Sequence, residues 1–139
     1  MAKRENKEKK TNPELSPKAW FDRSEEDVKA AKAMLEAHRY TWCAFICQQA
    51  VEKYLKAWYV KKFNEIPPYI HKLEKLCKIL GLEIPDQLLD SIVRIDRYYI
   101  ATRYPDYKEE VGIATYEEAK NIFAKTKRVL KWLKEQLET

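Results

Sequence analysis

Residues 40–63 read YTWCAFICQQAVEKYLKAWYVKKF, a run without Gly or Pro that is long enough for about six helical turns. Its apolar residues recur at steps of three and four, the period of one helical face: Ala44, Cys47, Val51, Tyr54, Leu55 and Trp58. The first half is apolar on almost every side. A helix of this kind needs cover from several directions, so we expect it at the centre of the fold or at a subunit contact.

Three polar residues on this helix need an explanation. Gln48 falls on the apolar face between Ala44 and Val51, and a buried amide must find hydrogen-bond partners. Gln48 either makes a core hydrogen bond that fixes the helix register or forms the polar wall of a groove. Glu52 and Lys53 lie beside it, and Glu52 precedes Lys56 by four residues, a spacing that favours an ion pair.

The rest of the chain predicts further helices. Ser16-Pro17 is typical of a helix start, Pro67-Pro68 breaks the helix that precedes it, and Gly81 favours a helix end. Thr115 and Glu118 have the spacing of a capping box, in which each side chain satisfies the other's backbone N–H. The expected helices are Pro17 to about Ala37, Tyr40–Phe63, about Ile70–Leu80, Pro85 to about Thr102, and Tyr116–Leu137. We predict an all-α fold, an antiparallel up-and-down four-helix bundle with one short extra helix.

Length and charge set the domain organisation. A chain of 139 residues with 35% charged residues and two glycines is typical of one helical domain. We expect residues 1–15 to be a flexible basic tail and residues 16–139 to be the bundle. Residues 1–12 carry five basic and two acidic side chains, so +3 of the net charge of +5 belongs to them and +2 to the remainder. The basic character therefore says little about a nucleic-acid surface on the fold itself.

Location and metal chemistry follow from what the sequence lacks. No apolar run is long enough for a membrane span or an export signal, so we expect a cytoplasmic protein without membrane contact. The odd number of cysteines argues against a disulfide framework, and we interpret Cys43, Cys47 and Cys77 as small buried hydrophobes. There is no metal-ligand spacing, glycine-rich phosphate loop or nucleophile elbow, so neither a metal nor a cofactor is expected.

Two places could carry chemistry. His71 opens the short helix, where the helix dipole favours its neutral form; it suits acid–base or hydrogen-bonding work, although a lone His more often serves in capping or packing. The second place is the turn Arg103-Tyr104-Pro105-Asp106. Arg103 follows Asp96 by seven residues, hence on the same helical face, and a contact between them could fix a guanidinium for binding. The alternative, a structural ion pair that anchors the loop, is favoured by composition alone.

Several of these pieces, in this order, resemble the HEPN domain family. They are an N-terminal helix with Trp20, then QQAVEKYLKA at residues 48–57, His71-Lys72-Leu73, RYPD at residues 103–106, and Tyr116-x-x-Ala119. The resemblance covers roughly Ser16 to Leu137. It implies a helical bundle similar to the C-terminal domain of kanamycin nucleotidyltransferase, and a homodimer. It also implies a minimal nucleotidyltransferase as the partner in a two-component, toxin–antitoxin-like pair.

The resemblance further implies which residues bind or react. Many members are metal-independent ribonucleases with an Arg and a His separated by four to six intervening residues, across the dimer interface. That motif is absent here, because residues 31–33 and 64–66, at the required distance from His38 and His71, contain no Arg. The positions that match the family's pattern are therefore carried over as a ligand site and not as catalytic residues: Gln48, Glu52, Lys53, His71, Arg103 and Asp106, with Tyr104 or Tyr107 available to stack on a base.

Three hypotheses follow. The first is a dimeric binding protein for a nucleotide or a nucleotidyltransferase partner, which would not be an enzyme. The second is a ribonuclease toxin with a diverged centre, in which His71 would transfer protons and Arg103 would stabilise charge on RNA phosphate. The third is a scaffold whose only partner is a second copy of itself.

Overall fold

The structure is a computed structural model that describes residues 12–103 and 114–138, with side chains placed at residues 12–99 and 114–138. Its elements are a 3₁₀ turn, η1 (Pro13–Leu15), and the helices α2 (Pro17–Glu36), α3 (Tyr40–Phe63), α4 (Leu73–Ile79), α5 (Asp86–Arg103) and α7 (Tyr116–Leu137). No strand occurs in these ranges, so the all-α prediction is confirmed. No helix in the described ranges has both the length and the apolar character that crossing a membrane requires.

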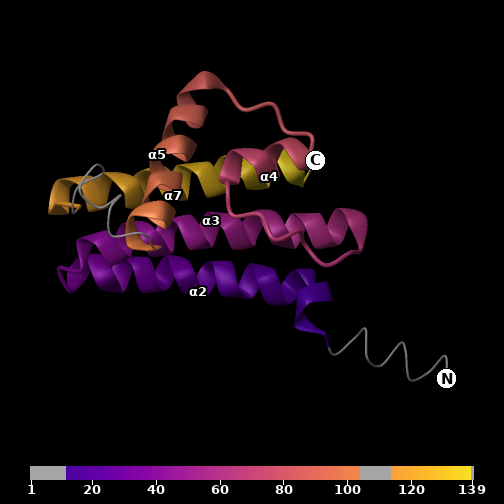
Figure 1. The fold of residues 1–139 in the computed structure, drawn as a ribbon, viewed down its shortest axis with the longest axis horizontal. Helices are drawn as coiled ribbons and strands as arrows, with labels where there is room; N and C mark the ends of the chain where they lie inside the picture. Colours follow the sequence, from indigo (N-terminus) through magenta and orange to yellow (C-terminus); the bar gives the residue numbers. More distant parts are fainter. Residues whose placement is uncertain (1–11, 104–113, 139) are drawn as a thin grey trace.

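The α3 helix lies at the centre, as its sequence predicts. It contacts α2, α4, α5 and α7, and its predicted bounds, Tyr40–Phe63, are those observed. Figure 1 shows α2, α3 and α7 lying lengthwise, whereas α5 crosses them steeply. The arrangement therefore differs from a bundle of four nearly aligned helices.

The α2–α3 hairpin turns within three residues. Ser16 caps α2, its Oγ accepting a hydrogen bond from the Ala19 N–H at 3.1 Å. His38 adopts the left-handed conformation, with a φ of 61°, and the chain reverses there into α3. Part of the expected tail is ordered against this hairpin, because the Trp20 Nε1–H donates to the Glu14 carbonyl of η1 at 3.1 Å.

The short helix α4 begins three residues later than the sequence predicts. The residue before it, Lys72, is extended, with φ −71° and ψ 116°. Neighbouring helices hold the chain there: the Leu73 N–H donates to the Asp96 carboxylate at 3.1 Å, and the His71 carbonyl accepts from Gln48 at 2.9 Å. Tertiary hydrogen bonds thus override the local helix preference of residues 70–72.

The predicted capping box at α7 is half correct. The Thr115 Oγ accepts from the Glu118 N–H at 3.2 Å, as expected. The Glu118 carboxylate, however, binds the Arg94 guanidinium at 2.8 and 2.9 Å and the Tyr98 hydroxyl at 3.2 Å. An arginine offers a stronger, two-point partner than a backbone N–H, so Glu118 joins α7 to α5 instead of closing its own helix start.

The core is built around the apolar face of α3. Ala44, Cys47, Val51 and Leu55 are fully buried, and Tyr54 and Trp58 pack against the same cluster. All three cysteines are buried thiols, as predicted. Burial raises the pKa of the Cys77 thiol to about 12, which keeps it protonated and unreactive at neutral pH.

Candidate functional site

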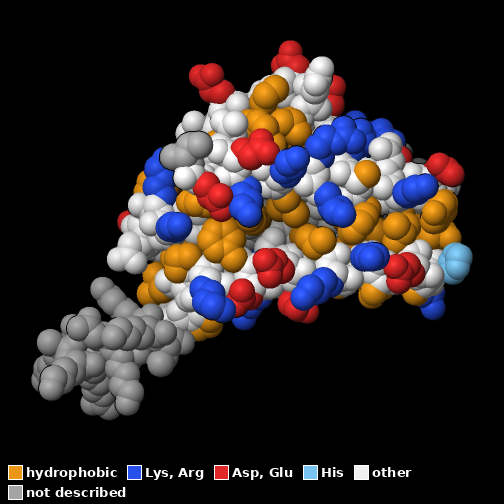
Figure 2. Space-filling view, turned by 180° about the vertical axis from the view of Figure 1, so that it is seen from behind, with side chains coloured by type: hydrophobic (Ala, Val, Ile, Leu, Met, Phe, Trp, Pro, Cys, Tyr) orange, Lys and Arg blue, Asp and Glu red, His pale blue; other side chains and the backbone are white. Residues whose placement is uncertain are grey.

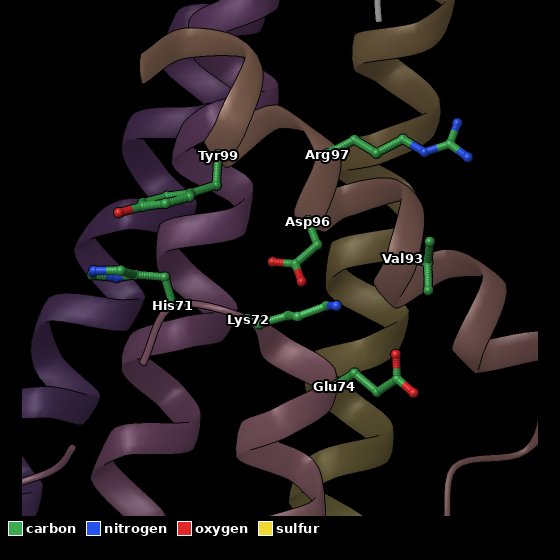
Figure 3. Close-up of a pocket in the computed structure, with 7 residues that line it drawn as sticks. All are labelled: His71, Lys72, Glu74, Val93, Asp96, Arg97 and Tyr99. Carbon is green, nitrogen blue, oxygen red and sulfur yellow. The ribbon is translucent and has the colours of Figure 1, made fainter. Parts of the chain in front are cut away.

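A pocket of about 400 Å³ opens between the start of α4 and the middle of α5. Its wall is formed by His71, Lys72, Glu74, Val93, Asp96, Arg97 and Tyr99 (Figure 3). Figure 3 shows the Lys72 side chain reaching across the pocket between Asp96 and Glu74, while Arg97 extends outward at the rim. The pocket thus combines an aromatic wall with charged groups at a few defined positions.

Gln48 is the hydrogen-bonding centre behind this pocket. Its side chain is fully buried. Its Nε2 lies 2.9 Å from the His71 carbonyl and 3.3 Å from both a Glu52 and an Asp96 carboxylate oxygen. The Gln49 Nε2 donates to the Gln48 Oε1 at 2.7 Å, which fixes the orientation of the amide. Gln48 therefore joins α3, α5 and the segment before α4 through one side chain.

Glu52 forms a second, charged layer of the cluster. Its side chain is only 7% exposed and is approached from two sides: by the equally buried Lys56 Nζ at 3.1 Å and by the His71 Nδ1 at 3.1 Å. A carboxylate beside Nδ1 favours the tautomer with the proton on that nitrogen. The Nε2 is then left as an acceptor, and it is buried with no hydrogen-bond partner among the described residues.

Asp96 is the carboxyl group of this hydrogen-bonded cluster that also lines the pocket. Burial raises its pKa to about 6, although hydrogen bonds from Gln48 and the Leu73 N–H act in the opposite direction. The negative charge of Glu52 raises the pKa further, whereas the Lys72 ammonium lowers it. Near neutral pH this carboxyl can accept hydrogen bonds, and in mildly acidic solution it can also donate one.

Aromatic rings form a continuous series, in which Tyr99 and His71 line the pocket and the other rings extend beyond it. Tyr99 stacks on His71 with ring centres 4.6 Å apart, and Phe45 stacks on Tyr99 at 6.3 Å. Figure 3 shows the Tyr99 and His71 rings lying one above the other. Trp42 meets Phe45 edge-on, and Tyr69 meets His71 edge-on. Since Trp42 is 51% exposed and Tyr69 is 87% exposed, the series reaches the surface at both ends.

A family comparison identifies the chain. The model of the HEPN domain matches residues 17–136, nearly the whole of the described part. The chain belongs to the HEPN domain family. No functionally curated protein matches it.

Two solved structures are similar to this HEPN chain. The first is the crystal structure of TT1696 from Thermus thermophilus, with a TM-score of 0.71 and 24% identity over 86% of this chain and 96% of the other. The second is the crystal structure of ST0689, described as an archaeal HEPN homologue, with a TM-score of 0.69 and 25% identity over 88% of this chain and 98% of the other. Both support the all-helical HEPN fold.

The structure gathers some of the residues expected from the HEPN resemblance and separates others. Gln48, Glu52 and His71 meet in one cluster. Lys53 lies elsewhere, with its Nζ 2.6 Å from the Asp27 carboxylate of α2. The remaining candidates fall outside what is described: the side chain of Arg103, and Tyr104, Asp106 and Tyr107 entirely. The proposed Asp96–Arg103 contact stays a prediction, although Asp96 already binds Gln48 and Leu73.

Other pocket residues of this HEPN domain were not identified from the sequence as ligand-binding. Tyr99 and Val93 each lie three residues from Asp96, so a helical projection centred on Asp96 would have grouped them. In the sequence, Lys72 stands out only as part of the His71-Lys72-Leu73 motif of the family resemblance. Its direction across the pocket depends on the extended conformation that α3 and α5 impose on residues 71 and 72, and no local sequence signal predicts that.

Proposed function

We propose that this HEPN protein is a binding protein whose pocket between α4 and α5 takes a nucleotide. The observation that carries the proposal is the stacked Tyr99–His71 pair in the wall of a 400 Å³ pocket crossed by the Lys72 ammonium. Small-molecule sites commonly have volumes of about 300–1,000 Å³, so one nucleoside unit is a suitable occupant. Since His71 and Phe45 already stack on Tyr99, a base would meet the ring pair edge to face, a geometry worth about 0.5–1.5 kcal/mol between aromatic rings.

The polar groups of the pocket suit the same ligand. Asp96 can accept hydrogen bonds from the amino or imino groups of a base, and Lys72 can bind phosphate. The charge distribution on the face drawn in Figure 2 gives no support for a long nucleic-acid track. On the face seen in Figure 2, acidic side chains lie among the basic ones, without the continuous basic stripe expected for a nucleic-acid track.

Binding can be tested with Val93, which lines the pocket and is 40% exposed, so a polar replacement does not disturb the core. Adenosine, guanosine and their mono-, di- and triphosphates would be titrated calorimetrically. We expect Val93→Glu to weaken nucleotide binding by about tenfold or more, equivalent to about 1.4 kcal/mol, through filling the pocket and repelling phosphate.

The matched control is Val93→Thr, which keeps the size of the side chain without adding charge. It should bind within about twofold of the wild type, well under 1.4 kcal/mol. Absence of binding by the wild type to every compound in the panel would refute the proposal, as would equal binding by Val93→Glu.

A ribonuclease is the second candidate, because the Glu52 carboxylate orients the His71 imidazole as it would an acid–base group. The burial of the His71 Nε2 favours the binding role, since substrate protons could reach that nitrogen only if the stacked rings moved. Incubation with mixed RNA, with and without a chelator, separates the two. Cleavage lost in His71→Asn would establish the enzyme; no cleavage would leave the binding protein.

We also propose a homodimer that serves a minimal nucleotidyltransferase. Support for self-association comes from Trp42, which is half exposed on the central helix, packs edge-on against Phe45 and offers an aromatic surface that a second copy could cover. Light scattering should give twice the chain mass for the wild type and a smaller mass for Trp42→Glu; a monomeric wild type would refute the dimer. Co-purification with a nucleotidyltransferase encoded beside it would test the partner.

A further inference from the structure

We infer that the phosphates of the bound nucleotide lie along α4, in a groove formed by Lys72, Lys75 and Lys78. This inference rests on the proposed nucleotide binding and adds an orientation and a ligand class to it. A groove of about 220 Å³ adjoins the pocket, and these three lysines line it together with Glu74. Lys72 and Glu74 line both the groove and the pocket. A ligand with its base beside Tyr99 therefore extends directly into the groove.

The three ammonium groups are available for an anion. None of Lys72, Lys75 and Lys78 has an ion-pair partner within the described ranges, and all three are exposed. The lysines of α3 differ: Lys53 is held by Asp27 at 2.6 Å and Lys56 by Glu52 at 3.1 Å. Because an unpaired ammonium has no partner to lose, it can bind phosphate without breaking a protein contact.

The spacing of the lysines points to more than one phosphate. Lys75 and Lys78 lie three residues apart on α4, about 4.5 Å along the helix axis, and Lys72 is the residue before the helix. A row of cations suits a di- or triphosphate better than a single phosphate. The groove contains one carboxylate against three lysines, which leaves it positively charged.

Glu74 has a distinct place in this scheme. It lies where the pocket meets the groove, which is where the sugar of a nucleotide would fall between base and phosphates. A carboxylate there repels phosphate and accepts hydrogen bonds from hydroxyl groups. Lys75 and Lys78 line the groove alone, so the order aromatic wall, Glu74, then Lys75 and Lys78 matches base, ribose, phosphates, and the ligand class is a ribonucleoside di- or triphosphate.

The test uses a phosphate series. The full-length wild type would be titrated with adenosine, AMP, ADP and ATP, and with the guanosine series, at low and high salt. Affinity should rise with each phosphate, and the rise should shrink at high salt. The double variant Lys75→Gln/Lys78→Gln should bind the nucleosides as the wild type does but lose about tenfold or more in triphosphate affinity.

The matched control is Lys131→Gln/Lys134→Gln, which makes the same charge change at the same spacing on the exposed surface of α7. It should keep the wild-type phosphate dependence. A second variant, Glu74→Gln, should reduce the preference for ATP over deoxy-ATP.

Two results have separate meanings. If the wild type binds nucleosides and triphosphates equally, or if Lys75→Gln/Lys78→Gln loses no more than the α7 control, the phosphate groove is refuted while the base pocket stands. If no compound of either series binds, the nucleotide-binding proposal itself fails and the groove fails with it.

Discussion

Two residues of α5, Arg94 and Asp96, make polar contacts in different environments. Asp96 faces inward to Gln48 and the start of α4, without a cation in an ion pair with it among the described residues. Arg94 faces α7 and binds the Glu118 carboxylate at 2.8 Å, with its own side chain 46% exposed. Burial raises the pKa of Asp96 to about 6, whereas the Arg94 guanidinium lowers the pKa of Glu118. The comparison shows that burial and charged partners act in opposite directions on the pKa of a carboxyl group.

The two carboxyl groups give stability opposite dependences on pH. Asp96 binds its proton more tightly in the folded state, so its contribution is greatest below pH 4 and is lost as pH rises through about 6. Glu118 binds its proton less tightly when folded. Its contribution is therefore present above its ordinary pKa of 4.5 and is lost as pH falls through the lowered value.

The largest expected effect comes from breaking the inner contact at its centre. Gln48→Leu keeps the size of the side chain but leaves the His71 carbonyl, Glu52 and Asp96 without their shared donor. Glu52 keeps Lys56 and His71 as partners and Asp96 keeps the Leu73 N–H, so the groups that lose their described partner are the His71 carbonyl and the Gln49 amide. Each buried polar group left unsatisfied costs about 1–3 kcal/mol, so we expect a loss of roughly 2–3 kcal/mol in unfolding free energy. Urea unfolding followed by circular dichroism would measure it. A loss below about 1 kcal/mol would mean that water replaces the amide.

A smaller effect on the unfolding free energy, one that depends on pH, is expected when Asp96 can no longer titrate. Asp96→Asn removes the titrating group while its amide oxygen can still accept from the Leu73 N–H. Wild-type stability should fall by roughly 1–2 kcal/mol more than that of the variant between about pH 4 and pH 6, after allowance for partial exposure. Thermal unfolding across this range would show it. The groups that face Asp96 are Glu52 and Lys72, so both stay unchanged in the experiment.

The control for that measurement lies on the same helix. Asp90 is exposed, so Asp90→Asn should keep the wild-type pH dependence. Parallel pH curves for the wild type and Asp96→Asn would show that Asp96 titrates in the folded protein as it does in the unfolded chain.

The smallest effect is expected at the outer contact. Arg94→Ala removes a partly exposed ion pair, and such pairs contribute about 0–1 kcal/mol. The cost in unfolding free energy should shrink further in high salt, unlike the cost of Gln48→Leu. Urea titrations at two salt concentrations would compare them. A cost of Arg94→Ala equal to that of Gln48→Leu would remove the distinction between the two contacts.

Much of the fold could be predicted from local patterns. The α3 bounds follow from an uninterrupted helical period between Tyr40 and Phe63, and the α2 start follows from Ser16-Pro17. These signals depend on residues within one turn of each other, so tertiary contacts do not need to be known. The late start of α4 and the steep path of α5 were not predicted, because both depend on hydrogen bonds and packing between distant segments.

The features of the candidate site likewise fall into those that local sequence signals predict and those that depend on tertiary contacts. By itself the sequence determined that the chain is an all-helical HEPN domain and that Gln48 needs polar partners, because period, caps and motifs are properties of neighbouring residues. Only the tertiary structure decided that Asp96 and Tyr99 join the cluster around Gln48, that Lys53 turns to α2, and that Lys72 crosses the pocket. Those positions are set where three helices meet, and a meeting of helices depends on packing across tens of residues.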